Sequence, residues 1–188
     1  RRVLFRSDQG REALRLAQDW PDVSAEDRGA AERNLALFQL ALGELAPAEQ
    51  SFEKAAGWIR QSVGESTGTY WDIEAERARM TCLQGQPAAA LERLDRLWPL
   101  IARADSHTTD GASARLRQGE CLLASGRADA ALAVMQPAVE AIVRQPQTSY
   151  DARHARSALA FALAATGHTA DSRHMLRPAC DEIGRAHV

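Results

Sequence analysis

Small and apolar residues recur at fixed distances from four glycines along this chain. The glycines are Gly43, Gly85, Gly126 and Gly167, which stand 42, 41 and 41 residues apart. Small or apolar residues precede each glycine by twelve, seven and five positions and follow it by five, nine and twelve positions. The later spacings, of four and then three residues, mark one face of an α-helix. Each unit is therefore predicted to be a helix, a glycine turn and a second helix.

Two positions of the repeat have a clear physical task. The glycine ends the first helix, because a tight turn commonly needs one residue in the left-handed region, where only glycine escapes the Cβ clash. The residue seven positions earlier is small in every unit, being Ala36, Ala78, Gly119 or Ala160. A small residue lets the paired helix approach to the lower end of the roughly 8–10 Å range of helix separations. We expect a leucine there to force the hairpin apart.

A period near 41 residues predicts stacked helical hairpins, since no single hairpin can bury its apolar face alone. We therefore expect an all-α solenoid. Three prolines, Pro99, Pro137 and Pro178, fall inside the predicted second helices. An interior proline costs roughly 3 kcal/mol or more unless the helix bends. These prolines predict kinks that curve the stack.

The two ends of the chain differ in origin from the repeats. Residues 1–7 (RRVLFRS) and 182–188 (EIGRAHV) look like a translated sequencing adapter, because codons for the first can be chosen whose reverse complement encodes the second. We thus expect one repeat array over residues 8–181, cut at both ends and belonging to a larger protein. Its first element would be a second helix over residues 11–20 without a partner, so self-association through exposed end repeats is expected.

The charge balance argues against nucleic acid as a partner of this region. The chain has 23 basic and 25 acidic residues and a net charge of −2; setting the ends aside removes four arginines and one glutamate, which leaves 19 and 24. Phosphate binding needs a basic surface instead. No run of about 18 apolar residues occurs, so we expect no membrane span. Abundant alanine and arginine, with Lys54 as the one lysine, are typical of a GC-rich bacterial genome.

The cysteines indicate neither a disulfide framework nor a metal site. Cys82, Cys121 and Cys180 stand at positions that are apolar in other units, and their spacing matches no zinc or redox motif. A reducing cytoplasm fits this usage best. The chain also has no glycine-rich phosphate loop, no catalytic-loop aspartate motif and no other cofactor motif. We expect no cofactor and no enzymatic activity in this chain.

The repeat resembles the tetratricopeptide repeat (TPR), with a small residue in the first helix, glycine at the turn, and alanine, a large apolar residue and alanine in the second. The resemblance covers residues 8–181, although the period of about 41 exceeds the usual 34 or so. Long units of this kind are similar to those of kinesin light chains and to those appended to bacterial protein kinases and transcriptional regulators. The resemblance implies a right-handed superhelix of about nine helices whose concave groove binds a peptide or partner protein.

The resemblance also implies which residues line that groove: positions thirteen, ten, nine and six before each glycine. They are Arg33, Asn34, Leu37, Asp72, Glu76, Arg79, Ser113, Arg117, Glu120, His154, Ser157 and Phe161.

These residues allow more than one interpretation. Arg33, Asn34 and Arg117 resemble the clamp by which some family members hold a C-terminal carboxylate. Glu76 and Glu120 would oppose such a ligand. The alternative is a solvated helix face with local ion pairs, such as one between Glu76 and Arg79.

Leu37 and Phe161 share the position six residues before the glycine. An exposed aromatic residue in a groove is a plausible anchor for a partner. The alternative for both residues is contact with a neighbouring helix.

Two classes of function follow from the sequence. The first is a protein-interaction scaffold that binds a peptide or partner helix in its groove. The second is the regulatory or sensor region of a bacterial serine/threonine protein kinase or transcriptional regulator, whose catalytic or DNA-binding domain lies outside this sequence. Fold alone does not choose between them.

Overall fold

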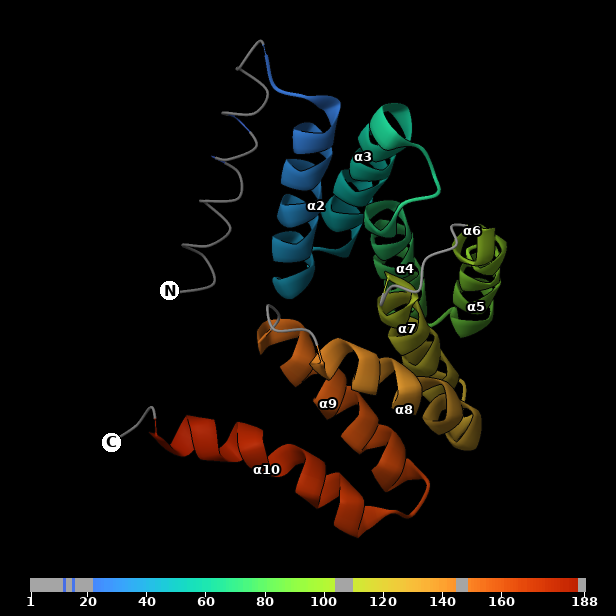
Figure 1. The fold of residues 1–188 in the computed structure, drawn as a ribbon, viewed down its shortest axis with the longest axis vertical. Coiled ribbons are helices and arrows are strands. Elements are labelled where there is room, and N and C mark those ends of the chain that lie inside the picture. Colours follow the sequence, from blue (N-terminus) through green and yellow to red (C-terminus); the bar gives the residue numbers. More distant parts are fainter. Residues whose placement is uncertain (1–11, 13–14, 16–21, 104–109, 145–148, 186–188) are drawn as a thin grey trace.

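The computed structural model describes residues 12, 15, 22–103, 110–144 and 149–185, and the described part is helical with no strand (Figure 1). The first helices of the four units are α2 (Ala25–Ala41), α4 (Gly68–Leu83), α7 (Asp110–Ala124) and α9 (Ser149–Ala165). The second helices are α3 (Leu45–Val63), α5 (Pro87–Asp95) with α6 (Trp98–Arg103), α8 (Ala128–Val143) and α10 (Thr169–Arg185). Only residues 12 and 15 of the predicted helix over residues 11–20 are described. Residues 1–7 and the side chain of Cys180 lie outside what is described.

The four predicted glycine turns are confirmed. Gly43, Gly85, Gly126 and Gly167 have φ values of 78°, 81°, 75° and 86°, which other residues rarely adopt. The amide that follows each glycine donates to the carbonyl five residues earlier, at 2.8–3.1 Å, and the glycine amide donates to the carbonyl three residues earlier. This is the Schellman arrangement, which satisfies the last carbonyls of the first helix. It reverses the chain into the second helix at the same place in every unit.

Each apolar cluster of the core is shared by consecutive hairpins. The first combines Phe52 and Ile59 of α3 with Ile73 and Met80 of α4. The next joins α4 and α5 to α7, and the third joins α7 and α8 to α9. The hairpins therefore stack in chain order, each completing the core of the one before it (Figure 1). This confirms the predicted solenoid, in which stability arises between neighbours.

The prolines affect their helices differently. The second helix of the second unit is interrupted at residues 96–97, and Pro99 is the second residue of the short helix α6 that follows. Proline has no amide proton to donate to the carbonyl of Asp95, so the interruption coincides with a missing backbone bond. Helix α8 instead continues through Pro137 as one helix, and α10 extends past Pro178.

Two helical glycines provide a matched test of the close packing within hairpins. A Cβ at Gly119 would lie 2.2 Å from Cγ of Met135, whereas a Cβ at Gly57 would have no heavy atom within 4 Å. We expect Gly119→Ala to lower the free energy of unfolding by about 1–3 kcal/mol through overpacking. Gly57→Ala should raise it by about 0.5–1 kcal/mol through helix propensity. Urea unfolding followed by circular dichroism measures both changes; equal stabilisation by both variants would contradict the close approach at Gly119.

Candidate binding groove

A pocket of about 370 Å³ lies where the ends of α4 and α7 meet the middle of α9. We call it the first-helix groove, because first helices alone line it. Five of the twelve predicted residues take part: Arg79, Glu120, His154, Ser157 and Phe161. The apolar part of its lining consists of Cys82, Leu83, Leu123, Ala124 and Ala158.

Exposed apolar side chains concentrate in this groove. Among the described residues the large exposed hydrophobic side chains are Val63, Leu83 and Phe161, at 45%, 57% and 71% exposure, and the last two line the groove. Leu37, at the same repeat position as Phe161, instead packs against the core cluster of the first hairpin. Helix contact therefore accounts for Leu37, whereas the side chain of Phe161 is exposed. Leu83 was not predicted, because it lies at the end of α4 outside the repeating stripe.

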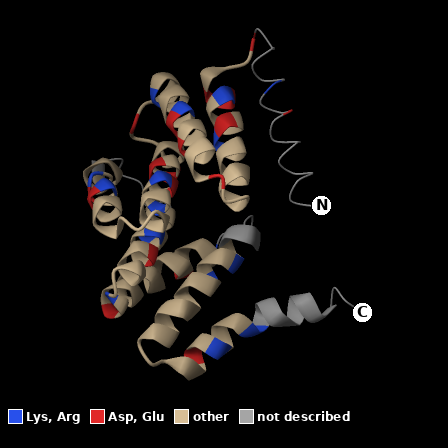
Figure 2. Cartoon of the chain, turned by 180° about the vertical axis from the view of Figure 1, so that it is seen from behind, with Lys and Arg blue, Asp and Glu red and all other residues tan. Residues whose placement is uncertain are grey.

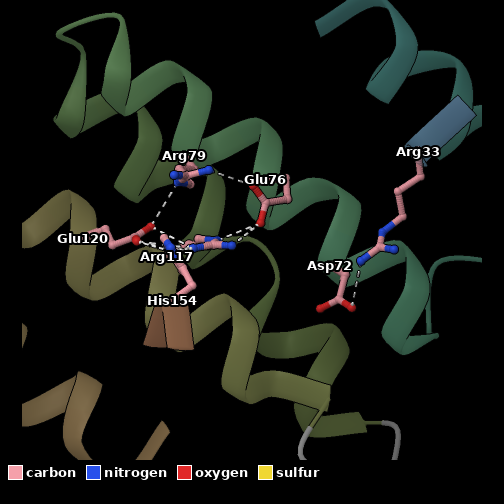
Figure 3. Close-up of polar contacts among 7 residues, drawn as sticks. All are labelled: Arg33, Asp72, Glu76, Arg79, Arg117, Glu120 and His154. Carbon is pink, nitrogen blue, oxygen red and sulfur yellow. Dashed lines mark hydrogen bonds and ion pairs between the residues drawn. The ribbon is translucent and has the colours of Figure 1, made fainter. Parts of the chain in front are cut away.

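Arg117 of α7 is held by two carboxylates, one of which, that of Glu120, lines the groove (Figure 3). Its Nε donates to Glu76 of α4 at 2.8 Å, its Nη2 also contacts Glu76, and its Nη1 lies 3.1 Å from Glu120 Oε2. The side chain is only 14% exposed. Burial works against the charged form, but Glu76 and Glu120 outweigh it and raise the pKa of Arg117. Arg117 therefore remains a cation that is already paired.

Glu120 is surrounded by nitrogen-bearing side chains from three helices. Besides Arg117, it accepts contacts from Arg79 Nε at 3.3 Å and from His154 Nε2 at 2.7 Å. Burial would raise its pKa, but Arg117, His154 and Arg79 together lower the pKa to about 2. Glu76 is paired in turn with Arg79 at 3.5 Å, the local ion pair anticipated above.

This geometry changes the interpretation of the predicted clamp. Two arginines and two glutamates neutralise one another, and Arg117 is occupied by Glu76 and Glu120, so it is not available to hold a ligand's carboxylate. The sequence does contain the signal for this pairing. Glu76 and Arg117 share one repeat position, nine before the glycine, and Arg79 and Glu120 share another, six before it. Stacking consecutive first helices brings each opposite-charge pair together.

The other predicted residues lie toward the first hairpin. Arg33 of α2 is 3.8 Å from Asp72 of α4, apart from the Arg117 cluster (Figure 3). Burial raises the pKa of Asp72 to about 6, although Arg33 and a hydrogen bond with Ser113 oppose the shift. Asn34 is exposed. These residues do not line the first-helix groove.

The cysteines of the described part of the chain are unpaired thiols. Cys82 and Cys121 are free and buried, and burial raises the pKa of the Cys121 thiol. Within the described ranges no group of three or more His, Cys, Asp or Glu side chains is placed to hold a metal ion.

A search of the same residues finds no helix with the length and apolar character needed to span a membrane. Basic and acidic residues are interspersed along α2, α3 and α4 (Figure 2).

The Arg117 cluster can be tested by removing one of its charges or three of them. Arg117→Met leaves Glu76 and Glu120 buried without their main partner, so we expect the free energy of unfolding at pH 7 to fall by about 3–5 kcal/mol. The triple variant Glu76→Gln, Arg117→Met, Glu120→Gln also removes the two buried carboxylate charges and should recover most of that loss, because Arg79, which then lacks its partners, is 26% exposed and can be solvated. Denaturant unfolding of both proteins measures this; a triple variant no more stable than Arg117→Met would contradict the charge explanation.

Asp72 should make the protein more stable as the pH falls, whereas an ordinary ion-paired carboxylate makes a protein less stable. Its folded pKa of about 6 exceeds the usual value of 3.8, so the native state binds this proton more tightly than the unfolded state does. The contribution of Asp72 to stability therefore increases as the pH falls from about 6 to about 4. Melting temperatures of the wild type and Asp72→Asn over this range should differ in slope, with the wild type gaining relative to the variant on acidification. Parallel profiles would contradict the raised pKa.

No protein-family model matches the chain, and no curated protein sequence matches it either. Solved structures are similar to it. TPR-like repeats of a putative kinesin light chain from Podosopora anserina share 15% identity at a TM-score of 0.59, over 98% of this chain and 88% of that one. BtubC (BKLC) from P. vanneervenii shares 16% identity at a TM-score of 0.62, over 95% of this chain and 72% of that one. The chain thus has a TPR-like repeat fold.

Proposed function

We propose that the first-helix groove binds a segment of a partner protein by enclosing one of its apolar side chains. The observation that carries this proposal is the exposure of Leu83 and Phe161 on the same pocket. An apolar pocket with convergent polar groups is the usual form of a binding site, and exposed aromatic side chains are common anchors of interfaces. Leu123 adds apolar surface to the same pocket.

The electrostatics of the groove favour an uncharged anchor. Glu76, Arg79, Arg117 and Glu120 neutralise one another, so the cluster offers no excess charge to an ionic ligand. Arg79 is 26% exposed and has N–H donors beyond the two that contact the glutamates. These donors suit a backbone carbonyl of the bound segment. The partner would thus contribute an apolar side chain and a neighbouring peptide group.

Val63 provides a matched control for the groove, since it is an exposed apolar residue at the end of α3 that does not line the pocket. Peptides selected from a displayed random library should lose affinity by about 30-fold with Phe161→Ala, the effect of a hot-spot residue. Leu83→Ser should also weaken binding, while Val63→Ala should change it by less than about twofold. Isothermal titration calorimetry measures all three.

Salt dependence gives a second readout of the same proposal. Because the groove charges are compensated, the dissociation constant should change by less than about threefold between 50 and 500 mM salt. Peptides whose dissociation constants are unchanged by both Phe161→Ala and Leu83→Ser would contradict an apolar anchor in this groove. A steep dependence of the dissociation constant on salt would contradict it as well.

A further inference from the structure

A second cavity, of about 410 Å³, lies between α8, α9 and α10. It shares helix α9 with the first-helix groove but uses other residues. His154, Ser157 and Phe161 line the groove, whereas Arg156, Leu159 and Leu163 line the cavity. Successive residues of a helix are rotated by about 100°, so the two sets occupy opposite faces of α9. We call this second site the outer cavity.

The outer cavity has both apolar and charged residues in its lining. The apolar ones include Leu132, Val139, Leu159 and Met175. Arg156 also lines it, and the described part of the chain contains no hydrogen-bond or ion-pair partner for this arginine. An arginine beside apolar surface, with no carboxylate paired to it, keeps the face of its guanidinium available for stacking.

The repeat register shows what occupies the equivalent place between the first two hairpins. There Glu74 and Arg77 stand eleven and eight positions before Gly85, and Arg93 stands eight positions after it. Glu49 stands six positions after Gly43. Arg77 contacts Glu49 and Glu74 at 2.8 Å each, and Arg93 lies 3.8 Å from both. Long polar side chains therefore fill this junction.

An arginine stacked on an aromatic ring occupies the junction between the second and third hairpins. The guanidinium of Arg115, eleven positions before Gly126, lies 4.4 Å from the ring centroid of Trp98, thirteen positions after Gly85. Such a pair is a cation–π interaction, in which the ring quadrupole attracts the cation.

The junction between the third and fourth hairpins retains the arginine but lacks the ring. Arg156 stands eleven positions before Gly167, as Arg115 stands before Gly126, but the position of Trp98 is taken by Val139. Leu159 and Met175 replace the arginines that fill the first junction. The substitutions are all to shorter or apolar side chains, and the outer cavity is the space that results.

We propose that the outer cavity binds a free planar aromatic molecule of about the size of the indole ring that this junction lacks. The ring would stack on the guanidinium of Arg156 and contact Leu159 and the thioether of Met175, a favourable neighbour for aromatic edges. The volume falls within the roughly 300–1,000 Å³ range of small-molecule sites. Glu140 and Asp171 also line the cavity and disfavour an anion, so the ligand is uncharged or cationic.

The three methionines of the chain make the proposal directly observable. Met175 lines the outer cavity, whereas Met80 and Met135 are core residues at 1% and 0% exposure. In protein labelled with ¹³C at the methionine methyl groups, titration with indole should shift the Met175 resonance in a saturable manner and leave the other two unchanged. Met175→Leu assigns the signal.

Two variants separate the outer cavity from the groove. Arg156→Ala should weaken indole binding by about fivefold, the loss of one cation–π contact. Phe161→Ala, on the opposite face of α9, should leave the indole titration unchanged, although it disrupts peptide binding in the groove. A third variant, Val139→Trp, restores the ring of the preceding junction and should abolish indole binding; if it does not fold, Arg156→Ala still decides.

Several outcomes would overturn the proposal. They are the absence of a Met175 shift at millimolar indole, an Arg156→Ala variant that binds indole as the wild type does, and equal binding of the non-aromatic analogue cyclohexanol. Binding of a tryptophan-containing peptide without binding of free indole would overturn the assignment to a small molecule. None of these results affects the groove, which the peptide titrations test independently.

Discussion

The guanidinium of Arg117 is the contact on which the geometry of the first helices depends. It joins α7 to Glu76 of α4 and, through Glu120, to His154 of α9. A buried cation is tolerated only with its partners at hydrogen-bond distance, so this cluster restricts the separation of three consecutive first helices. It also removes net charge from the first-helix groove. Shape and polarity of the groove therefore follow from the same interaction.

The stacked hairpins allow each junction to differ chemically without changing the fold. The core clusters use the same small and apolar positions in every unit, and the glycine turns repeat with the same hydrogen bonds. Positions beside these stripes are free to vary, because each hairpin contacts only its neighbours. The same repeat positions therefore form an ion-pair network at the first junction, the Arg115–Trp98 stack at the second and the outer cavity at the third.

The sequence predicts features that depend on residues close together in the chain better than features that depend on contacts between hairpins. Glycine turns and helical stripes were predictable, because backbone sterics and periodicity act over a few residues. Phe161 was found by its repeat position, but the contrast with Leu37 depends on what the neighbouring hairpin covers. Leu83 stood outside the repeating pattern. The pairing of Glu76 with Arg117, 41 residues apart, required comparing charges at equal positions in consecutive units.

Helix α9 connects the two candidate sites physically. It packs extensively against α8 and α10, whereas its contact with α7 is slight and is strengthened by the polar link from His154 to Glu120. The position of α9 is thus determined on the groove side by this polar link and on the opposite side by its packing against α8 and α10. Phe161 is carried on the groove face of the same helix and moves with it. The packing around Leu159 and Met175 therefore helps to set where the aromatic anchor of the groove stands, although neither residue touches the groove.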